Sequence, residues 1–124
     1  MYSMSIMASE KTMKQRSKAL KAFIEASYMG WRDVMADPEG SIAIYKKHVP
    51  EINLEYIRAN TMLGLSLMKT ERYRQNGIGW MEPKKMCSSV DLVNTYMGLS
   101  KTVACDDVYT NDFLTKVSMP DSFK

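Results

Sequence analysis

The chain has 124 residues, of which 45% are hydrophobic and 25% charged, and its formal net charge at pH 7 is +3. This length limits it to one domain, and the composition is ordinary for a globular protein. Lysines and arginines are mixed with acidic residues along the whole sequence, which argues against the basic stripe of a nucleic-acid binder. No stretch is apolar over the ~20 residues that a membrane span needs, so direct membrane insertion is not expected.

The first segment predicts the one good β-strand candidate. Residues 2–8 alternate between larger and smaller side chains, a pattern that suits a short strand. A single strand cannot satisfy its own backbone groups, so it must pair with a partner that the sequence does not reveal. Residues 1–8 also lack the basic start and the long apolar run of a signal peptide.

Helices are predicted for most of the first half. Ser9 suits the N-cap of a short helix, and apolar residues at helical spacing predict a long amphipathic helix over residues 18–36. Gly30 lies inside that helix, where glycine costs up to ~1 kcal/mol, so we expect a close helix contact there. Asp37 and proline then open a helix over residues 38–48.

The second half continues the helical pattern. Asn53 caps a predicted helix over residues 54–68, and residues 70–76 read as a short turn or a frayed helix. After a loop at residues 77–81, Pro83 begins a helix that ends at Gly98, a position suited to a left-handed cap.

The last segment predicts little further structure. Asp106 or Asp107 is expected to cap a final helical turn that carries Tyr109 and Phe113, and the tail from Thr115 is expected to be loose. The fold class is therefore mostly α, with five or six helices and one short N-terminal strand.

Few residues suggest chemistry. Cys87 and Cys105 do not form a CxxC pair, and zinc needs about four ligands, so no metal site is expected. A disulfide is compatible with an exported protein, but the spacing does not establish one, and two buried thiols are the favoured interpretation. His48 is the only histidine, and at a predicted helix end it is expected to bond the last carbonyls. Catalysis is therefore not expected.

The acidic and sulfur-containing residues each have two interpretations. Asp106, Asp107 and Asp112 could act as an acid–base pair or hold a cation, but they coincide with a predicted helix start, which favours capping. The 12 methionines could form an adaptable binding surface, but core filling is favoured.

Five short motifs in a fixed order carry a resemblance to the solute-binding proteins of bacterial ABC importers. The closest branch binds the pyrimidine precursor of thiamine, and its relatives bind nitrate, sulfonates and riboflavin. The resemblance covers about residues 3–114, and its motifs are Gly30-Trp31 and residues 37–39, 47–51, 77–83 and 106–114.

The resemblance implies that residues 1–124 are a single partial domain, the C-terminal segment of lobe 1 of a two-lobed type II periplasmic-binding α/β fold. Such a parent would be periplasmic, or lipid-anchored and extracellular, and would deliver a small solute to a membrane permease without a cofactor. Its N-terminal part, which supplies most ligand contacts, has no counterpart here. Some eukaryotic relatives make the thiamine pyrimidine, but their reactive residues lie outside the matching segment, so no enzymatic activity is expected.

Three residues are the candidate ligand contacts. Tyr2 and Ser3 precede the strand that starts near the interlobe crossing in the family, and Trp80 sits on a glycine loop where it could stack on a flat heterocycle. The alternative is a free-standing helical interaction protein. Apolar helix faces without a sheet to cover would favour a homo-oligomer, with residues 2–8 paired across a twofold axis.

Overall fold

The computed structural model describes residues 5–123, which form a mostly helical fold. The helices are α1 (Glu10–Gln15), α2 (Ser17–Ala36), α3 (Pro38–His48), α4 (Leu54–Met68), α5 (Glu71–Asn76) and α6 (Pro83–Tyr96), with two 3-10 turns, η1 (Cys105–Asp107) and η2 (Asp121–Phe123). The expectation of five or six helices is confirmed for this part of the chain.

The expected N-terminal strand is not found among the described residues. Residues 5–9 precede α1 without regular structure, and residues 2–4 of the expected strand lie outside the described residues. The physical reason is that a strand needs a partner backbone, and residues 5–123 contain no other strand to supply one.

Side-chain caps set the starts of the helices where the sequence placed them. Asp37 Oδ1 accepts from Gly40 N at 2.9 Å, and Asn53 Oδ1 accepts from Tyr56 N at 2.8 Å. Each bond satisfies an amide that has no partner inside the helix. The expected bounds of α3 and α4 are confirmed, α2 begins one residue earlier than expected, and Gly98 has the left-handed φ of 61° expected after α6.

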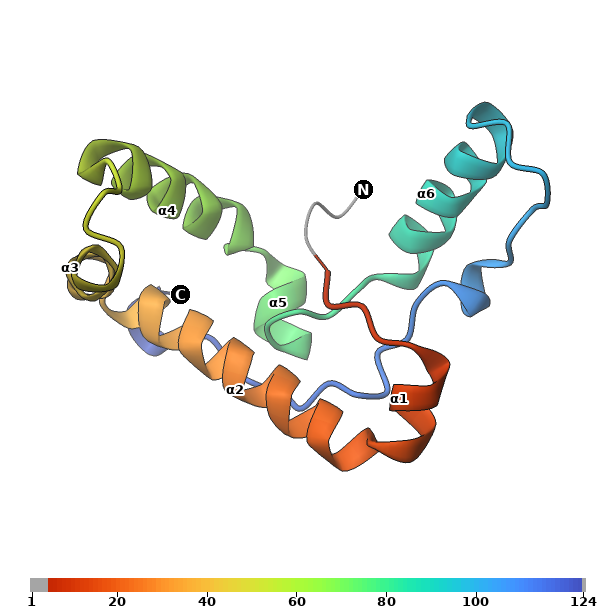
Figure 1. Ribbon diagram of the computed structural model, residues 1–124, viewed down its shortest axis with the longest axis horizontal. Helices are drawn as coiled ribbons and strands as arrows, with labels where there is room; N and C mark the ends of the chain where they lie inside the picture. Colours follow the sequence, from red (N-terminus) through yellow and green to blue (C-terminus); the bar gives the residue numbers. More distant parts are fainter. Residues whose placement is uncertain (1–4, 124) are drawn as a thin grey trace.

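The helices form an open V (Figure 1). The long helix α2 lies along the base, α3 turns at one end, and α4 returns above α2 as one arm. The other arm is α6, which rises at the opposite end. The C-terminal segment runs back along α2, and η2 packs against that helix (Figure 1).

The main hydrophobic core lies where α2, α4 and the C-terminal segment meet. We call this region the helical core, and its buried residues are Met35, Leu65, Ile78, Val117, Met119 and Phe123. Three of them belong to the tail that the sequence predicted to be loose, so that prediction is wrong. Val117 and Met119 are two positions apart in extended chain, where alternate side chains point to the same side.

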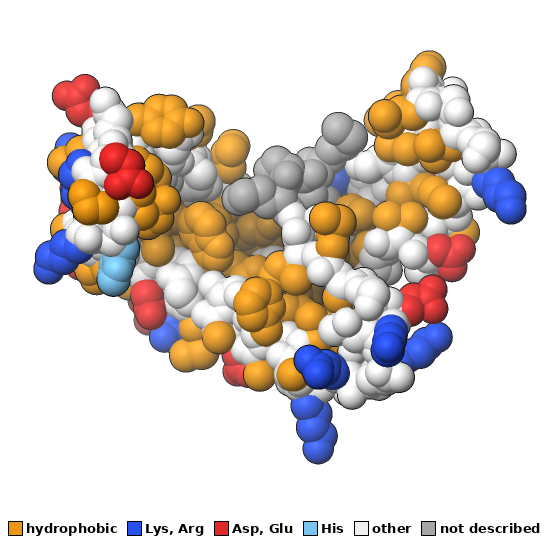
Figure 2. All heavy atoms as spheres, viewed as in Figure 1, with side chains coloured by type: hydrophobic (Ala, Val, Ile, Leu, Met, Phe, Trp, Pro, Cys, Tyr) orange, Lys and Arg blue, Asp and Glu red, His pale blue; other side chains and the backbone are white. Residues whose placement is uncertain are grey.

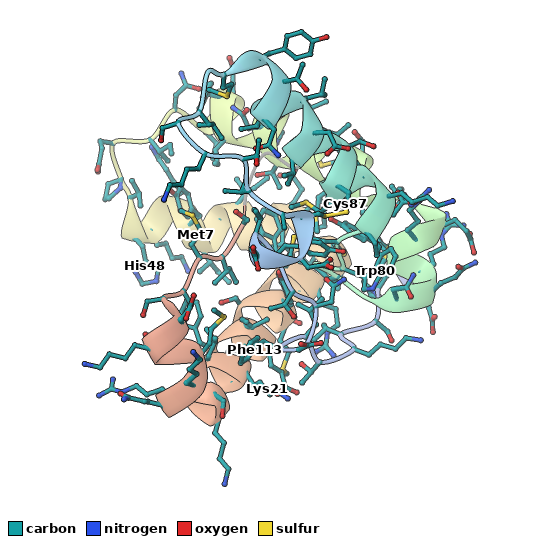
Figure 3. The ribbon with its side chains drawn as sticks, turned by 90° about the vertical axis from the view of Figure 1, so that its right-hand side faces the viewer. Met7, Lys21, His48, Trp80, Cys87 and Phe113 are labelled. Carbon is teal, nitrogen blue, oxygen red and sulfur yellow. A yellow bond between two sulfur atoms is a disulfide. The ribbon has the colours of Figure 1, made fainter. Side chains whose placement is uncertain are left out.

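A second region, the α6 arm, comprises α6 and residues 97–107. Cys87 in α6 and Cys105 in η1 form a disulfide with their Cα atoms 5.0 Å apart, which corrects the expectation of two unpaired thiols. Figure 3 shows this bond joining the helix to the turn. Asn94 adds a second link, because its side chain bonds both the amide and the carbonyl of Val103, at 3.0 and 2.9 Å.

Three further expectations are wrong. An added Cβ at Gly30 would meet nothing within 4 Å, so no helix packs closely there. Asp106 and Asp107 lie within η1, which has no side-chain cap, and Tyr109 and Phe113 follow it outside any helix. Lys46 Nζ, rather than His48, bonds the carbonyls after α3, those of Pro50 and Ile52.

Candidate functional site

The three candidate ligand contacts do not form one site among the described residues. Tyr2 and Ser3 lie outside residues 5–123, so their placement is not described. Trp80 is partly buried on the loop between α5 and α6, at the base of the α6 arm (Figure 3). The loop around Trp80 is therefore the part of the predicted site whose geometry can be followed.

The two glycines of this loop allow close approach from both sides. Gly77 and Gly79 have φ values of 92° and 85°, which side chains rarely adopt. A Cβ on Gly77 would lie 3.1 Å from the carbonyl oxygen of Val117, and one on Gly79 would overlap the ring of Tyr28. Between them, Ile78 is 2% exposed, and its amide donates to the Val117 carbonyl at 3.0 Å.

Asn111 fixes the other side of the loop. Its side-chain oxygen accepts from Met81 N at 3.0 Å, and its side-chain nitrogen donates to Met81 O at 2.8 Å. These bonds join the motif at residues 77–83 to the motif at residues 106–114, which lies about thirty positions later. Sequence reasoning missed the role of Asn111, although an asparagine between turn residues is a typical partner for loop backbone.

The groups around the loop indicate a structural role for it rather than a catalytic one. Partial burial raises the pKa of the Tyr28 phenol above its ordinary value of 10.0, so this ring is neutral at physiological pH. An ion pair between Arg72 and Glu82 flanks the loop. Within residues 5–123, no group of three or more histidine, cysteine or acidic residues is placed to hold a metal ion.

Two open depressions lie on the surface of the described residues, and Trp80 lines neither of them. One depression is lined by residues 15–19 between α1 and α2, and another by one face of α6, from Ser88 to Tyr96. Each is lined by a single stretch of chain, whereas small-molecule sites are concave and gather polar groups from several elements.

The comparisons with known proteins support one family for the first third of the chain. Residues 1–41 match the family model described as NMT1/THI5 like. The match includes the Gly30-Trp31 pair and residues 37–39, and it ends before the glycine–tryptophan loop. No curated protein and no solved structure matches the chain.

A helix must be both long and apolar to cross a membrane. Among residues 5–123, no helix meets both conditions.

Proposed function

We propose that this chain is a segment of the solute-binding protein of a bacterial ABC importer, contributing to one lobe of a type II periplasmic-binding fold. The observation that carries the proposal is the match of residues 1–41 to the NMT1/THI5-like family model. The later motifs follow in the order that the resemblance requires, and the structure joins two of them through the bonds between Asn111 and Met81.

The chemistry of the cysteines supports an exported parent. Disulfides persist in oxidising compartments such as the periplasm and are rare in the cytosol. The pairing of Cys87 with Cys105 suits a periplasmic protein, or one anchored by lipid outside the cell. A parent in this location would pass its solute to a membrane permease.

The geometry also limits what the segment would contribute. Trp80 would form one wall of the solute site, and Tyr2 and Ser3 would contribute from the N-terminal segment. Because Trp80 lines neither of the two open depressions of the described residues, we expect most contacts to a solute such as the thiamine pyrimidine precursor to come from outside this chain. The proposed role is binding and delivery, without catalysis.

The test begins with the DNA around the coding region. The proposal predicts neighbouring permease and ATPase genes, and an in-frame extension that encodes the rest of a two-lobed protein. The extended protein is then titrated by calorimetry with the pyrimidine precursor, nitrate, an alkanesulfonate and riboflavin. Binding of one solute that weakens in Trp80→Ala, but not in the matched variant Trp31→Ala on α2, is the expected result. A locus without transporter genes, together with no binding, would contradict the proposal.

A second candidate function is a free-standing helical interaction protein. The observation that favours it is the large number of exposed hydrophobic side chains, which include Phe23, Tyr56, Leu63, Leu67 and Tyr96, each at least 60% exposed. The genes around the coding region separate the two candidates, because an interaction protein has no need of neighbouring transporter genes.

A further inference from the structure

Helix α4 has two apolar faces, and only one of them is buried against other described residues. Leu65, at 2% exposed, points into the helical core. Tyr56, Leu63 and Leu67 lie on the opposite side and are 65%, 61% and 71% exposed. Their spacing of seven and four residues puts them in one stripe along the helix. A surface helix ordinarily carries polar residues on that side, so the second stripe indicates a partner.

The stripe has the spacing of a helix–helix seam. With Asn60 included, the positions 56, 60, 63 and 67 alternate by four and three residues, as the core positions of a coiled coil do. A single asparagine in such a seam is known to fix the register and the number of helices. In the single chain, Asn60 Nδ2 donates to the carbonyl of Tyr56 at 3.0 Å, so the side chain already lies along the seam.

The flanks of the stripe are small and uncharged. Ala59, Gly64 and Ser66 border it, and a Cβ added to Gly64 would meet nothing within 4 Å. Packing within the chain therefore does not explain a glycine that costs ~1 kcal/mol in a helix interior. Residues 59–68 carry no charge, so two copies of this face would meet without like-charge repulsion.

The total surface of the chain is large enough for a stable dimer. Its accessible surface is 9113 Å², while a self-contained monomer of 14.2 kDa exposes about 6,800 Å². The excess of roughly 2,300 Å² is spread over the whole chain, with the exposed side chains of α4 as one part of it, and it is larger than the ~800 Å² that each partner buries in an interface of standard size. Figure 2 shows part of this surface as hydrophobic side chains over the α4 arm and in the hollow of the V.

We propose that the outer face of α4 is a self-association surface, on which a second copy of this chain packs its own α4 around a twofold axis. Tyr56, Leu63 and Leu67 of the two copies interdigitate, with Asn60 inside the seam. A twofold pair uses the same patch on both copies, which suits a face that is apolar, uncharged and bordered by small residues. This interface is distinct from the strand pairing expected from residues 2–8, and it does not depend on the proposed solute-binding role.

Sedimentation equilibrium of the 124-residue chain tests the proposal. The wild-type chain is expected to dimerise, and Leu63→Glu combined with Leu67→Glu to weaken the dimer by roughly 100-fold or more, since each carboxylate would be buried in the seam. The matched control is Leu92→Glu, at a leucine of α6 that is 53% exposed, and it should change the dissociation constant by less than about threefold. Circular dichroism confirms that each variant keeps its helices.

A second variant keeps the test independent of damage to the fold. Asn60→Leu removes the polar residue from the seam and should tighten association by about tenfold, because such an asparagine costs stability in exchange for register. A wild-type chain that stays monomeric at millimolar concentration would overturn the proposal. So would a dimer that Leu92→Glu dissociates and the α4 variants do not, or an Asn60→Leu chain that associates no more tightly than the wild type.

Discussion

The helical core and the α6 arm are held together by different means. Of the nine buried hydrophobic side chains among the described residues, only Val90 lies in the α6 arm. The arm depends instead on the disulfide between Cys87 and Cys105 and on the paired hydrogen bonds between Asn94 and Val103. One region is stabilised by removing apolar surface from water, and the other by covalent and polar links between a helix and the segment that returns beside it.

This contrast teaches where each region is vulnerable. Truncating buried side chains should weaken the helical core and leave the arm's links in place. Reduction should affect the arm first and leave α2 and α4 packed. The two regions meet at the glycine–tryptophan loop, which precedes α6 and also contacts Val117 of the core.

The largest effect is expected in the tail of the helical core. Met119→Ala combined with Phe123→Ala should lower the free energy of unfolding by roughly 5 kcal/mol or more, because both side chains are at least 94% buried and leave cavities. Chemical denaturation followed by circular dichroism measures the change. Lys116→Ala combined with Ser118→Ala is the control at exposed positions of the same segment. Equal stability of the two double variants would mean that the tail does not belong to the core.

The next effect is expected in the α6 arm. Closing a loop of 18 residues stabilises a protein by about 3 kcal/mol in the chain-entropy account, so Cys87→Ser combined with Cys105→Ser should cost about that much. Hydrogen exchange should show faster exchange in α6 than in α2 or α4.

Dithiothreitol gives the matched measurement for the disulfide. It should reproduce the effect in the wild-type chain and leave the double serine variant unchanged. Uniform acceleration of exchange across α2, α4 and α6 would show that the arm and the core unfold as one unit, and the comparison between the two regions would then fail.

A smaller effect is expected where the two regions meet. Asn111→Ala removes both bonds to Met81 and leaves two partly buried backbone groups without these partners, which should cost about 1–3 kcal/mol. Asn76→Ala, whose side chain bonds the Arg72 carbonyl at an exposed site, is the control and should cost less. In Asn111→Ala, the fluorescence of Trp80 should shift toward the red, because the loop that carries Trp80 loosens. An unchanged fluorescence spectrum would show that the hydrogen bonds of Asn111 do not hold the loop around Trp80 in place.

Local signals in the sequence predicted the elements, and distant pairings decided how they are arranged. Asp37, Asn53 and Pro83 act within one turn of their own helices, so the starts of α3, α4 and α6 could be read from neighbouring residues. The burial of Val117 and the pairing of Cys87 with Cys105 depend on segments that fold back from far along the chain. No periodicity within the tail or the return segment reports such contacts.

The candidate site shows the same division. The glycines around Ile78 predicted a loop, and both adopt the left-handed conformation that glycine favours. Their physical role depends on Tyr28 and Val117, which approach from about fifty positions before and forty positions after in the sequence. For that reason the motif could be recognised as special from the sequence, while the neighbours that require its glycines could not.

The smallest effect is a dependence on alkaline pH that arises at the contact between Tyr28 and Gly79. Burial raises the pKa of Tyr28 above 10.0, so the folded state holds the phenol proton more tightly than the unfolded state does. The stability from this group is fully present below pH 10 and is lost as the pH rises through the folded-state pKa, because only the unfolded state releases the proton at first. Tyr28→Phe keeps the ring against Gly79 and should flatten the decline in unfolding free energy that begins near pH 10 and continues as the pH rises through the folded-state pKa. Tyr96→Phe, at a tyrosine that is 78% exposed, should retain the wild-type decline. If both variants follow the wild-type curve, then the Tyr28 phenol is solvated in the folded chain, and the glycine loop is held by Val117 and Asn111 without a buried ring beneath it.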